Sequence, residues 1–307
     1  MKDYSSPVYT VRRKLRPYKG FLYLLPSIIV LCVFTIYPLI KTFMMSFMED
    51  YNLVNGTYTA INLENYKELF SDATFLAALK NTGIYVIFVV PISVVLSLII
   101  AVFINDVVRG KAIFQTLYFR PYVTSVIAIG LVWRWMFNSN YGLINSILNL
   151  FGLESIEWLN LPKYAMPALI IFSVWKSLAF NILIFLSGLQ TIPQDIYRAA
   201  RVDSTPKIRV FFRLTVPQMK PIIVYAFMMG FISAFKVYNE VYSLFGGTRA
   251  GPANSAITVV YYIYAKFYNS YRYGIASAAA VVLFVIIFVF TMIERYVTRD
   301  RDKVKSK

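Results

Sequence analysis

The stretch that decides the fold is QTIPQDIYRAARVDSTPKIRVFFRLTVPQMKP, residues 190–221. It is polar and basic, yet it lies between two long apolar runs, residues 165–189 and 222–245. A run of about 20 mostly apolar residues is long enough to cross a lipid bilayer as a helix. The stretch is therefore predicted to be a loop between two membrane spans, and the fold class follows from finding the other spans.

Further apolar runs on both sides of this loop complete the predicted bundle. Residues 21–40, 81–105 and 274–293 carry no charge. Residues 122–137, 165–189 and 222–245 carry one cation each, at Arg134, Lys176 and Lys236, and the last run also contains Glu240. The first run is longer than the apolar core of a signal peptide and ends without a small-residue cleavage site, so it is expected to stay as an anchor. The predicted fold class is an all-α integral membrane protein with six transmembrane helices.

Composition excludes several classes of protein. Of the 307 residues, 58% are hydrophobic and 15% are charged, against roughly a quarter charged in ordinary soluble proteins. The chain has no histidine and a single cysteine, Cys32, which excludes histidine-based zinc sites, Ser-His triads and an internal disulfide.

The net charge of +16 comes from Lys and Arg gathered in residues 1–20, 105–120, 190–221 and 295–307. With six spans these segments share one side of the membrane, so the positive-inside rule explains the charge without a nucleic-acid partner.

The loop at residues 190–221 has its own predicted structure. Thr191 can cap a short helix that has Pro193 and Asp195 in its first turn and runs to about Val202. A turn at residues 203–206 then starts a second amphipathic helix, which Pro217 and Pro221 are predicted to end. Such a corner either lies on anionic lipid or docks into a groove of another protein, and the small side chains of Ala199 and Ala200 favour docking.

The spacing of residues in this loop resembles the EAA loop of permease subunits of binding-protein-dependent ABC importers. Arg198 stands where that family usually has Glu, and Ser204 stands where it has Gly. Residues 133–145, 186–193 and 245–252 are similar to the carbohydrate-uptake branch of the family. The matching loop positions are Arg198, Ala199, Ala200, Asp203, Ser204, Thr205, Phe211, Leu214, Val216, Pro217 and Pro221.

This resemblance implies a type I, MetI-like bundle with a cytoplasmic coupling helix. The chain is then expected to pass a sugar, by default an oligosaccharide, across a bacterial cytoplasmic membrane by alternating access, with both termini cytoplasmic. The expected partners are a second homologous permease subunit, two ATPase subunits that bind ATP and Mg, an extracellular solute-binding protein, the carbohydrate and the lipid bilayer. The chain itself is expected to have no catalytic residue, metal site or cofactor, since it lacks a Gly-x-x-x-x-Gly-Lys-Ser/Thr phosphate loop.

The resemblance also divides the chain. Residues 1–20 form a basic cytoplasmic N-terminus, 21–47 the first transmembrane helix, and 48–80 an extracytoplasmic loop. Residues 81–294 form the permease core with the coupling loop at 190–221, and 295–307 form a basic tail. The residues expected to contact the ATPase are Arg198, Ala199, Ala200, Asp203, Ser204, Phe211, Leu214 and Pro217. For Phe211 and Leu214, packing against the chain's own spans is an equal alternative.

Polar and aromatic residues inside the predicted spans are candidates for the substrate pathway, because rings stack on sugars and polar groups bind their hydroxyls. Lys236 and Glu240 are predicted to pair at i,i+4 on one helix, and contacts between helices are the alternative role for the whole set. Arg134 and Lys41 are expected to be structural cations near span ends. The pathway candidates are Trp175, Lys176, Asn181, Lys236, Tyr238, Asn239 and Glu240.

Two outer segments, residues 49–80 and 138–162, are long enough for small helices. In the second, an apolar face is expected to cover the short third span, with a partner contact as the alternative; its residues are Ile144, Ile147, Leu148, Leu150 and Phe151.

An ion-coupled secondary transporter remains the alternative function, although only Glu240 supplies a carboxylate within a predicted span. A membrane-embedded enzyme is the third class considered. The sequence leaves open which sugar is carried and whether it is charged.

Overall fold

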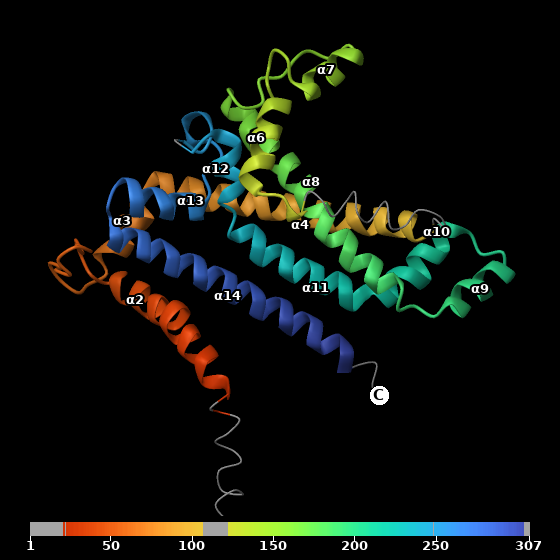
Figure 1. The fold of residues 1–307 in the computed structure, drawn as a ribbon, viewed down its shortest axis with the longest axis horizontal. Coiled ribbons are helices and arrows are strands. Elements are labelled where there is room, and N and C mark those ends of the chain that lie inside the picture. Colours follow the sequence, from red (N-terminus) through yellow and green to blue (C-terminus); the bar gives the residue numbers. More distant parts are fainter. Residues whose placement is uncertain (1–20, 22, 107–121, 248, 304–307) are drawn as a thin grey trace, which may run out of the picture.

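The computed structural model describes residues 21, 23–106, 122–247 and 249–303, and this part of the chain is helical without a named strand (Figure 1). The predicted basic N-terminus, residues 1–20, and the last residues of the predicted tail lie outside the described residues. The all-α fold class is confirmed.

Five helices are long and apolar enough to cross a membrane: Tyr23–Met45, Ala73–Asn105, Pro162–Leu189, Lys207–Phe235 and Tyr273–Val297. They correspond to five of the six predicted spans. In Figure 1 they contain α2 (Tyr37–Met45), α4 (Ala73–Asp106), α8 (Pro162–Leu189), α10 (Lys207–Val210) with α11 (Val216–Phe235), and α14 (Tyr273–Lys303). The run at residues 122–137 contains α6 (Val126–Met136), whose 11 described residues would extend about 16 Å, short of a bilayer core.

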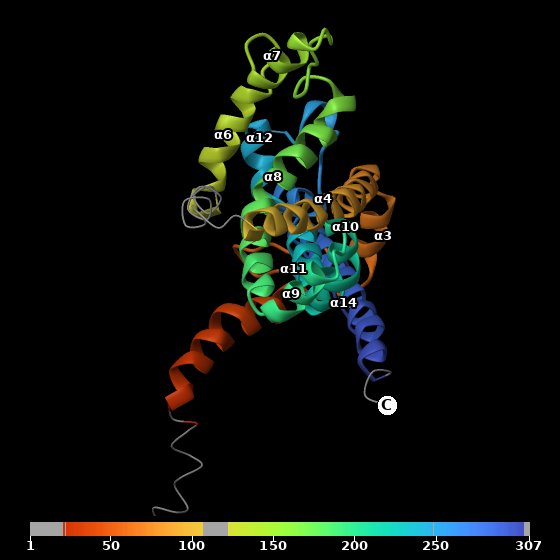
Figure 2. The same cartoon turned by 90° about the vertical axis from the view of Figure 1, so that its right-hand side faces the viewer.

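The bundle is built around α4. This helix packs most extensively along α8 and also against α11, while α14 packs on α11 and carries α2 on its other side (Figures 1 and 2). The fully buried side chains at these contacts are large and apolar; they include Phe75, Leu169, Phe172, Phe185 and Met219. Close helix approach is possible where a glycine replaces a larger residue, since a Cβ atom at Gly188 would lie 2.2 Å from Ile222 Cδ1.

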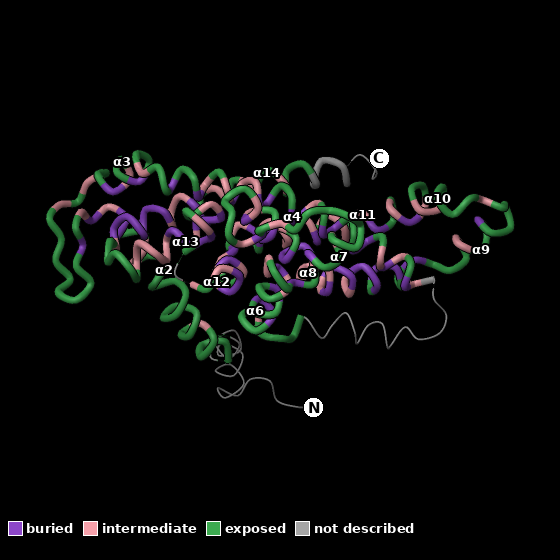
Figure 3. The backbone as a smooth tube through the Cα atoms, turned by 90° about the horizontal axis from the view of Figure 1, so that it is seen from above, coloured by how far each residue is buried: buried purple, intermediate pink, exposed green. Residues whose placement is uncertain are grey.

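The outer surface of the bundle is also apolar. Phe34, Phe103 and Phe288 on three different helices are exposed, and the helix that ends in α2 is exposed over nearly its whole length (Figure 3). A water-soluble protein does not display such a continuous apolar surface, whereas lipid tails solvate it.

Two predicted spans have different boundaries from those expected. The span at residues 81–105 begins earlier, at Ala73, within the segment 48–80 that was predicted to be a loop. The predicted helix at residues 222–245 ends at Phe235, and a new helix, α12 (Asn239–Phe245), starts after Lys236, Val237 and Tyr238. At its other end the helix begins at Lys207, so Pro217 and Pro221 do not end the second loop helix as predicted. The π-helical turn η2 (Phe211–Thr215) precedes α11 and places Pro217 in the first turn of that helix, where a missing amide hydrogen is tolerated.

Short helices form in both outer segments, as predicted. They are α3 (Glu64–Ser71) and α7 (Leu143–Leu150). On α7 the apolar residues divide: Ile144 and Leu148 pack against the core, whereas Leu150 is 84% exposed and Phe151 79% exposed. The expectation that the whole face covers the third span is therefore wrong, because the hydrogen bonds of Asn145 to Ser139, Ile156 and Trp158 orient the other side of α7 inward.

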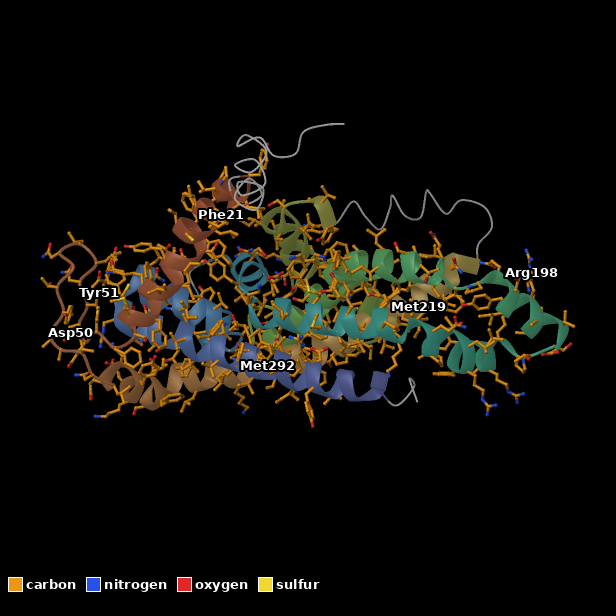
Figure 4. The ribbon with its side chains drawn as sticks, turned by 90° about the horizontal axis from the view of Figure 1, so that it is seen from below. Phe21, Asp50, Tyr51, Arg198, Met219 and Met292 are labelled. Atoms are coloured by element: carbon orange, nitrogen blue, oxygen red, sulfur yellow. The ribbon has the colours of Figure 1, made fainter. Side chains whose placement is uncertain are left out.

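The two ends of the long bundle differ. Asp50 and Tyr51 lie at one end and Arg198 lies at the other, so the loop at residues 190–221 projects from the end opposite to the outer segment at residues 48–62 (Figure 4).

Candidate functional site: the corner loop and the polar groups of the bundle

The projecting loop contains a well-defined corner after α9 (Gln194–Val202). Asp203 is the C-cap of this helix, and the next two amides turn back onto it: Ser204 N–H donates to the Arg201 carbonyl at 3.1 Å and Thr205 N–H to the Ala200 carbonyl at 2.9 Å. This is the Schellman arrangement, which satisfies the last carbonyls of a helix and needs a left-handed residue after the cap. Ser204 has φ of +50° and supplies that conformation at the position where glycine was expected from the resemblance.

The start of the loop differs in one detail from the prediction. Thr191 does not cap α9, because its hydroxyl donates to the Gly188 carbonyl at 2.7 Å and so satisfies the end of α8. Pro193 is the N-cap residue of α9 and has an extended ψ of 129°, while Asp195 lies in the first turn as expected. The two helices are therefore joined by a short connection in which the Thr191 side chain satisfies the end of α8 and not the start of α9.

The predicted coupling residues fall into two groups in the structure. Arg198, Ala199, Asp203, Ser204 and Pro217 are exposed, and Arg198 forms an exposed ion pair with Asp195 at 3.1 Å. Ala200 is buried, whereas Phe211 and Leu214 are half-buried, with Phe211 packed against the core. For Phe211 the structure therefore shows the packing alternative.

Three exposed apolar residues of the corner were not among the predicted coupling residues. Val202 is 84% exposed, Ile208 75% and Phe212 64%. They stand beside charged residues in the two amphipathic helices, which was the available signal, but the sequence could not show which apolar side chains face inward. We call Val202, Ile208 and Phe212 the corner patch.

Within the bundle, the polar candidates form an interhelical ion pair. Lys176 Nζ on α8 lies 2.5 Å from Glu240 Oε1 on α12, and the two side chains are 24% and 16% exposed. The predicted pair of Lys236 with Glu240 is wrong, because the break in the helix at residues 236–238 removes the i,i+4 spacing and leaves Lys236 exposed at the end of α11. The structure thus joins two candidates that lie on different predicted spans.

The remaining pathway candidates have different surroundings. Trp175 contacts Trp133 with ring centroids 5.3 Å apart, Asn181 is buried on α8, and Asn239 is exposed. Tyr238 belongs to a cluster of tyrosines from three segments, with its ring centroid 4.9 Å from that of Tyr264. Sequence reasoning missed this cluster, although the tyrosine-rich stretch at residues 261–273 was its signal. The further members are Tyr242, Tyr261 and Tyr268.

Arg134 has a structural explanation, as expected. It lies in the last turn of α6, and its guanidinium approaches Gly246, the left-handed C-cap residue of α12, where an added Cβ would lie 2.8 Å from Nη1. Cations are stabilised near the negative ends of helices. The same side chain lines a polar cavity of about 430 Å³ with Asn138, Asn160 and Arg249.

A charged network at the outer segments joins α3 and its C-cap residue Asp72 to α13 (Val259–Tyr264), to the π-helical turn η4 (Ala265–Asn269) and to Arg272, which precedes α14. Lys266 Nζ lies 2.9 Å from Asp72, the Tyr262 hydroxyl donates to Asp72 at 2.8 Å, and Arg272 pairs with Glu68 at 2.7 Å. Burial alone would raise the pKa of Asp72, but Lys266, Tyr262 and the Thr74 amide together lower it to about 2. We call Asp72, Lys266 and Tyr262 the outer clasp.

Metal ligands do not gather in the described part of the chain: it contains no group of three or more Cys, Asp or Glu side chains placed to hold a metal ion.

Comparisons with known proteins give a consistent result. Residues 74–303 match the family described as "Binding-protein-dependent transport system inner membrane component". The chain is 32% identical over 293 residues to the trehalose/maltose transport system permease protein MalF of Thermococcus litoralis, covering 95% of this chain and 98% of the relative. It is 33% identical over 298 residues to the arabinooligosaccharides transport system permease protein AraP of Halalkalibacterium halodurans, covering 96% and 92%.

The fold also matches a solved structure. A chain of the bacterial alginate ABC transporter in complex with its alginate pentasaccharide-bound periplasmic protein superposes with a TM-score of 0.79 at 23% sequence identity, covering 94% of this chain and 96% of that chain. At this identity the likeness shows the fold alone. Together with the apolar helices, it makes the chain a multi-pass membrane protein with the predicted permease fold.

Proposed function

Because the chain belongs to the family of inner membrane components of binding-protein-dependent transport systems, we propose that it is the translocation subunit of an ATP-driven sugar importer. It receives an oligosaccharide from an extracellular solute-binding protein and passes it across the cytoplasmic membrane by alternating access. The assembly contains a second, homologous permease subunit and two ATPase subunits, which bind ATP and Mg. The chain works as a translocation subunit and binds no cofactor of its own.

The observation that carries this proposal is the corner after α9. A docking element needs an exposed, rigid shape and an apolar surface that partner contacts can cover. The Schellman turn supplies the rigid shape, Asp203 and Arg198 supply an exposed polar rim, and the corner patch supplies the apolar surface. A helix resting flat on lipid would need no left-handed turn held by two backbone hydrogen bonds, so the geometry favours docking into a protein cleft.

The sugar as substrate rests on the relatives and on the polar groups of the bundle. The similar proteins MalF and AraP carry names of trehalose/maltose and arabinooligosaccharide transport. The pair of Lys176 with Glu240 neutralises both charges, which favours a neutral saccharide over an ionic one in their surroundings. Trp175 and Tyr238 provide aromatic faces near these polar groups.

The orientation follows from the same reasoning. A corner that docks onto ATPases lies in the cytoplasm, and the basic segments at both termini then lie on the same side, as the positive-inside rule requires. The outer segments with α3 and α7 face the extracellular solute-binding protein.

The decisive experiment reverses the charge at the corner. Asp203→Arg is introduced into the complete complex, and ATP-dependent sugar uptake into vesicles is measured beside co-purification of the ATPase subunits. The expected result is loss of ATPase association and at least a tenfold fall in uptake, with the membrane bundle still folded. Glu154→Arg, the same charge reversal at an exposed residue of the outer segment, is the matched control and is expected to retain ATPase association.

Two outcomes contradict the proposal. Unchanged ATP-driven uptake in Asp203→Arg removes the corner from the coupling mechanism. Uptake that persists without ATPase subunits and follows an ion gradient supports the alternative, an ion-coupled secondary transporter. The ion pair argues against that alternative, because Glu240, the one carboxylate within the predicted spans, is already paired with Lys176.

A further inference from the structure

The helix that leads from the corner into the bundle has a weak joint. Its residues Phe211–Thr215 form a π-helical turn, and Pro217 follows within the first turn of α11. A π-helical turn departs from the regular α-helical hydrogen-bond pattern, and proline removes an amide donor, so a helix bends more readily at such a place. A force applied at the corner would be absorbed here unless another contact held the joint.

A side-chain hydrogen bond spans this joint. The hydroxyl of Tyr197 on α9 lies 3.2 Å from the hydroxyl of Thr215, the last residue of the π-helical turn. Thr215 is buried, and the ring of Tyr197 is half-buried against the core. In the part of the chain that the structure describes, this is the one side-chain hydrogen bond between α9 and the Lys207–Phe235 helix.

Next to the joint, α8 and α11 are closely packed. Gly188 near the end of α8 faces Met219 and Ile222 of α11, and even an added Cβ would lie 2.2 Å from the Ile222 side chain. Met219 is fully buried at this contact. Close packing at this contact resists bending, so a change in the angle of the corner is expected on its loop side, where Tyr197 and Thr215 meet.

We propose that Tyr197 is a positioning residue for coupling: its hydrogen bond to Thr215 braces the corner so that a displacement of the corner moves α11. This inference rests on the proposed function. Without the brace, the ATPase still binds and hydrolyses ATP, but part of each displacement bends the joint and does not reach the spans.

The test uses Tyr197→Phe, which removes only the hydroxyl, in the complete complex with its solute-binding protein. The ratio of ATP hydrolysed to sugar transported is measured in vesicles. The expected result is normal ATPase association, retained hydrolysis and a ratio about fivefold higher, the factor expected for loss of one neutral hydrogen bond. Thr215→Val is expected to have the same effect, and the double variant no larger one, because both remove the same bond.

Conservative variants separate coupling from folding. Thr215→Ser keeps the hydroxyl and is expected to keep the wild-type ratio, and Tyr225→Phe, at an exposed tyrosine of α11, is the matched control. An unchanged ratio in Tyr197→Phe, or a Thr215→Ser variant as impaired as Thr215→Val, overturns the inference. A proportional loss of hydrolysis, uptake and assembled complex assigns the bond to folding and overturns it as well. Failure of the proposed function is distinguishable, because wild-type uptake would then continue without the ATPase subunits.

Discussion

Ser204 holds a backbone conformation that suits glycine better than serine. Its φ of +50° costs an L-residue about 1 kcal/mol, and the turn at the corner keeps it there through the two hydrogen bonds of the Schellman arrangement. The side chain of Ser204 is exposed, so burial does not compensate for this conformation. The corner is therefore slightly strained at the position next to Asp203.

Replacing Ser204 with glycine is expected to stabilise the corner by about 1 kcal/mol, because glycine reaches positive φ without a Cβ clash. Amide hydrogen exchange of the peptide that contains Thr205 measures this directly and is expected to slow about fivefold. Ser204→Ala keeps the Cβ atom and is the control, with no slowing expected. Equal exchange in the glycine variant and the wild type would show that the turn stores no strain.

Asp72 makes the outer clasp sensitive to pH. Its pKa of about 2 in the folded protein lies below the ordinary value of 3.8, so the charged form is the one that the fold stabilises. Charged Asp72 therefore contributes to the free energy of unfolding. This contribution is fully present above about pH 4 and is lost as the pH falls from there through about 2. The shift in the pKa corresponds to about 2 kcal/mol.

The variant Asp72→Asn is expected to lower the free energy of unfolding by about 2 kcal/mol at pH 7 and to lose this acid sensitivity. Unfolding midpoints of both proteins between pH 7 and pH 3 test this, with a difference that shrinks as the pH falls below 4. Glu68→Gln removes a more exposed ion pair and is expected to have a smaller effect. If the unfolding midpoints of Asp72→Asn and the wild type differed by the same amount at every pH, the charge of Asp72 would not be what stabilises the outer clasp.

An ion pair between Lys176 and Glu240 joins α8 to α12. Removing one charge of a partly buried pair leaves the other without compensation, which costs more than the pair itself contributes. Lys176→Met and Glu240→Gln are each expected to destabilise the complex by about 2 to 4 kcal/mol, and the double variant by much less than their sum. Thermal unfolding of the four proteins measures this coupling. Additive effects of the two substitutions would mean that the ion pair does not join the helices.

Helix boundaries were harder to predict than helix existence, and the Lys207–Phe235 helix shows why. The prolines at 217 and 221 are ordinary signals for a helix end, but a π-helical turn placed Pro217 in a first turn and the helix continued. The other end of this helix shows the reverse error: the helix ends at Phe235, although nothing in the apolar run at residues 222–245 indicated a break there. Both features depend on packing against α4, α6 and α8, which local sequence does not encode.

The molecule as a whole places its corner and its outer segments at opposite ends of the bundle (Figures 1 and 4). Val54 and Ile208 are both exposed at these ends, and three predicted spans separate them in the sequence. If all three cross the membrane, including the short run that contains α6, the two residues lie on opposite sides.

Single cysteines at these two positions, in a Cys32→Ala background, test the topology. An impermeant maleimide is expected to label Val54→Cys in intact cells and Ile208→Cys only after the membrane is permeabilised. Labelling of both from the same side would mean that the run at residues 122–137 does not cross. Labelling of Ile208→Cys alone in intact cells would reverse the proposed orientation.

Sequence alone determined the membrane class, the five spans that are long helices in the structure and the corner after α9, because each follows from local composition, apolar run length or turn chemistry. Tertiary structure decided which polar groups meet. Glu240 pairs with Lys176 and not with Lys236, Phe211 turns inward while Phe212 stays exposed, and Tyr197 reaches Thr215 across the corner. These outcomes depend on the angles at which separate helices pack, and side chains far apart in the sequence find their partners only once those angles are set.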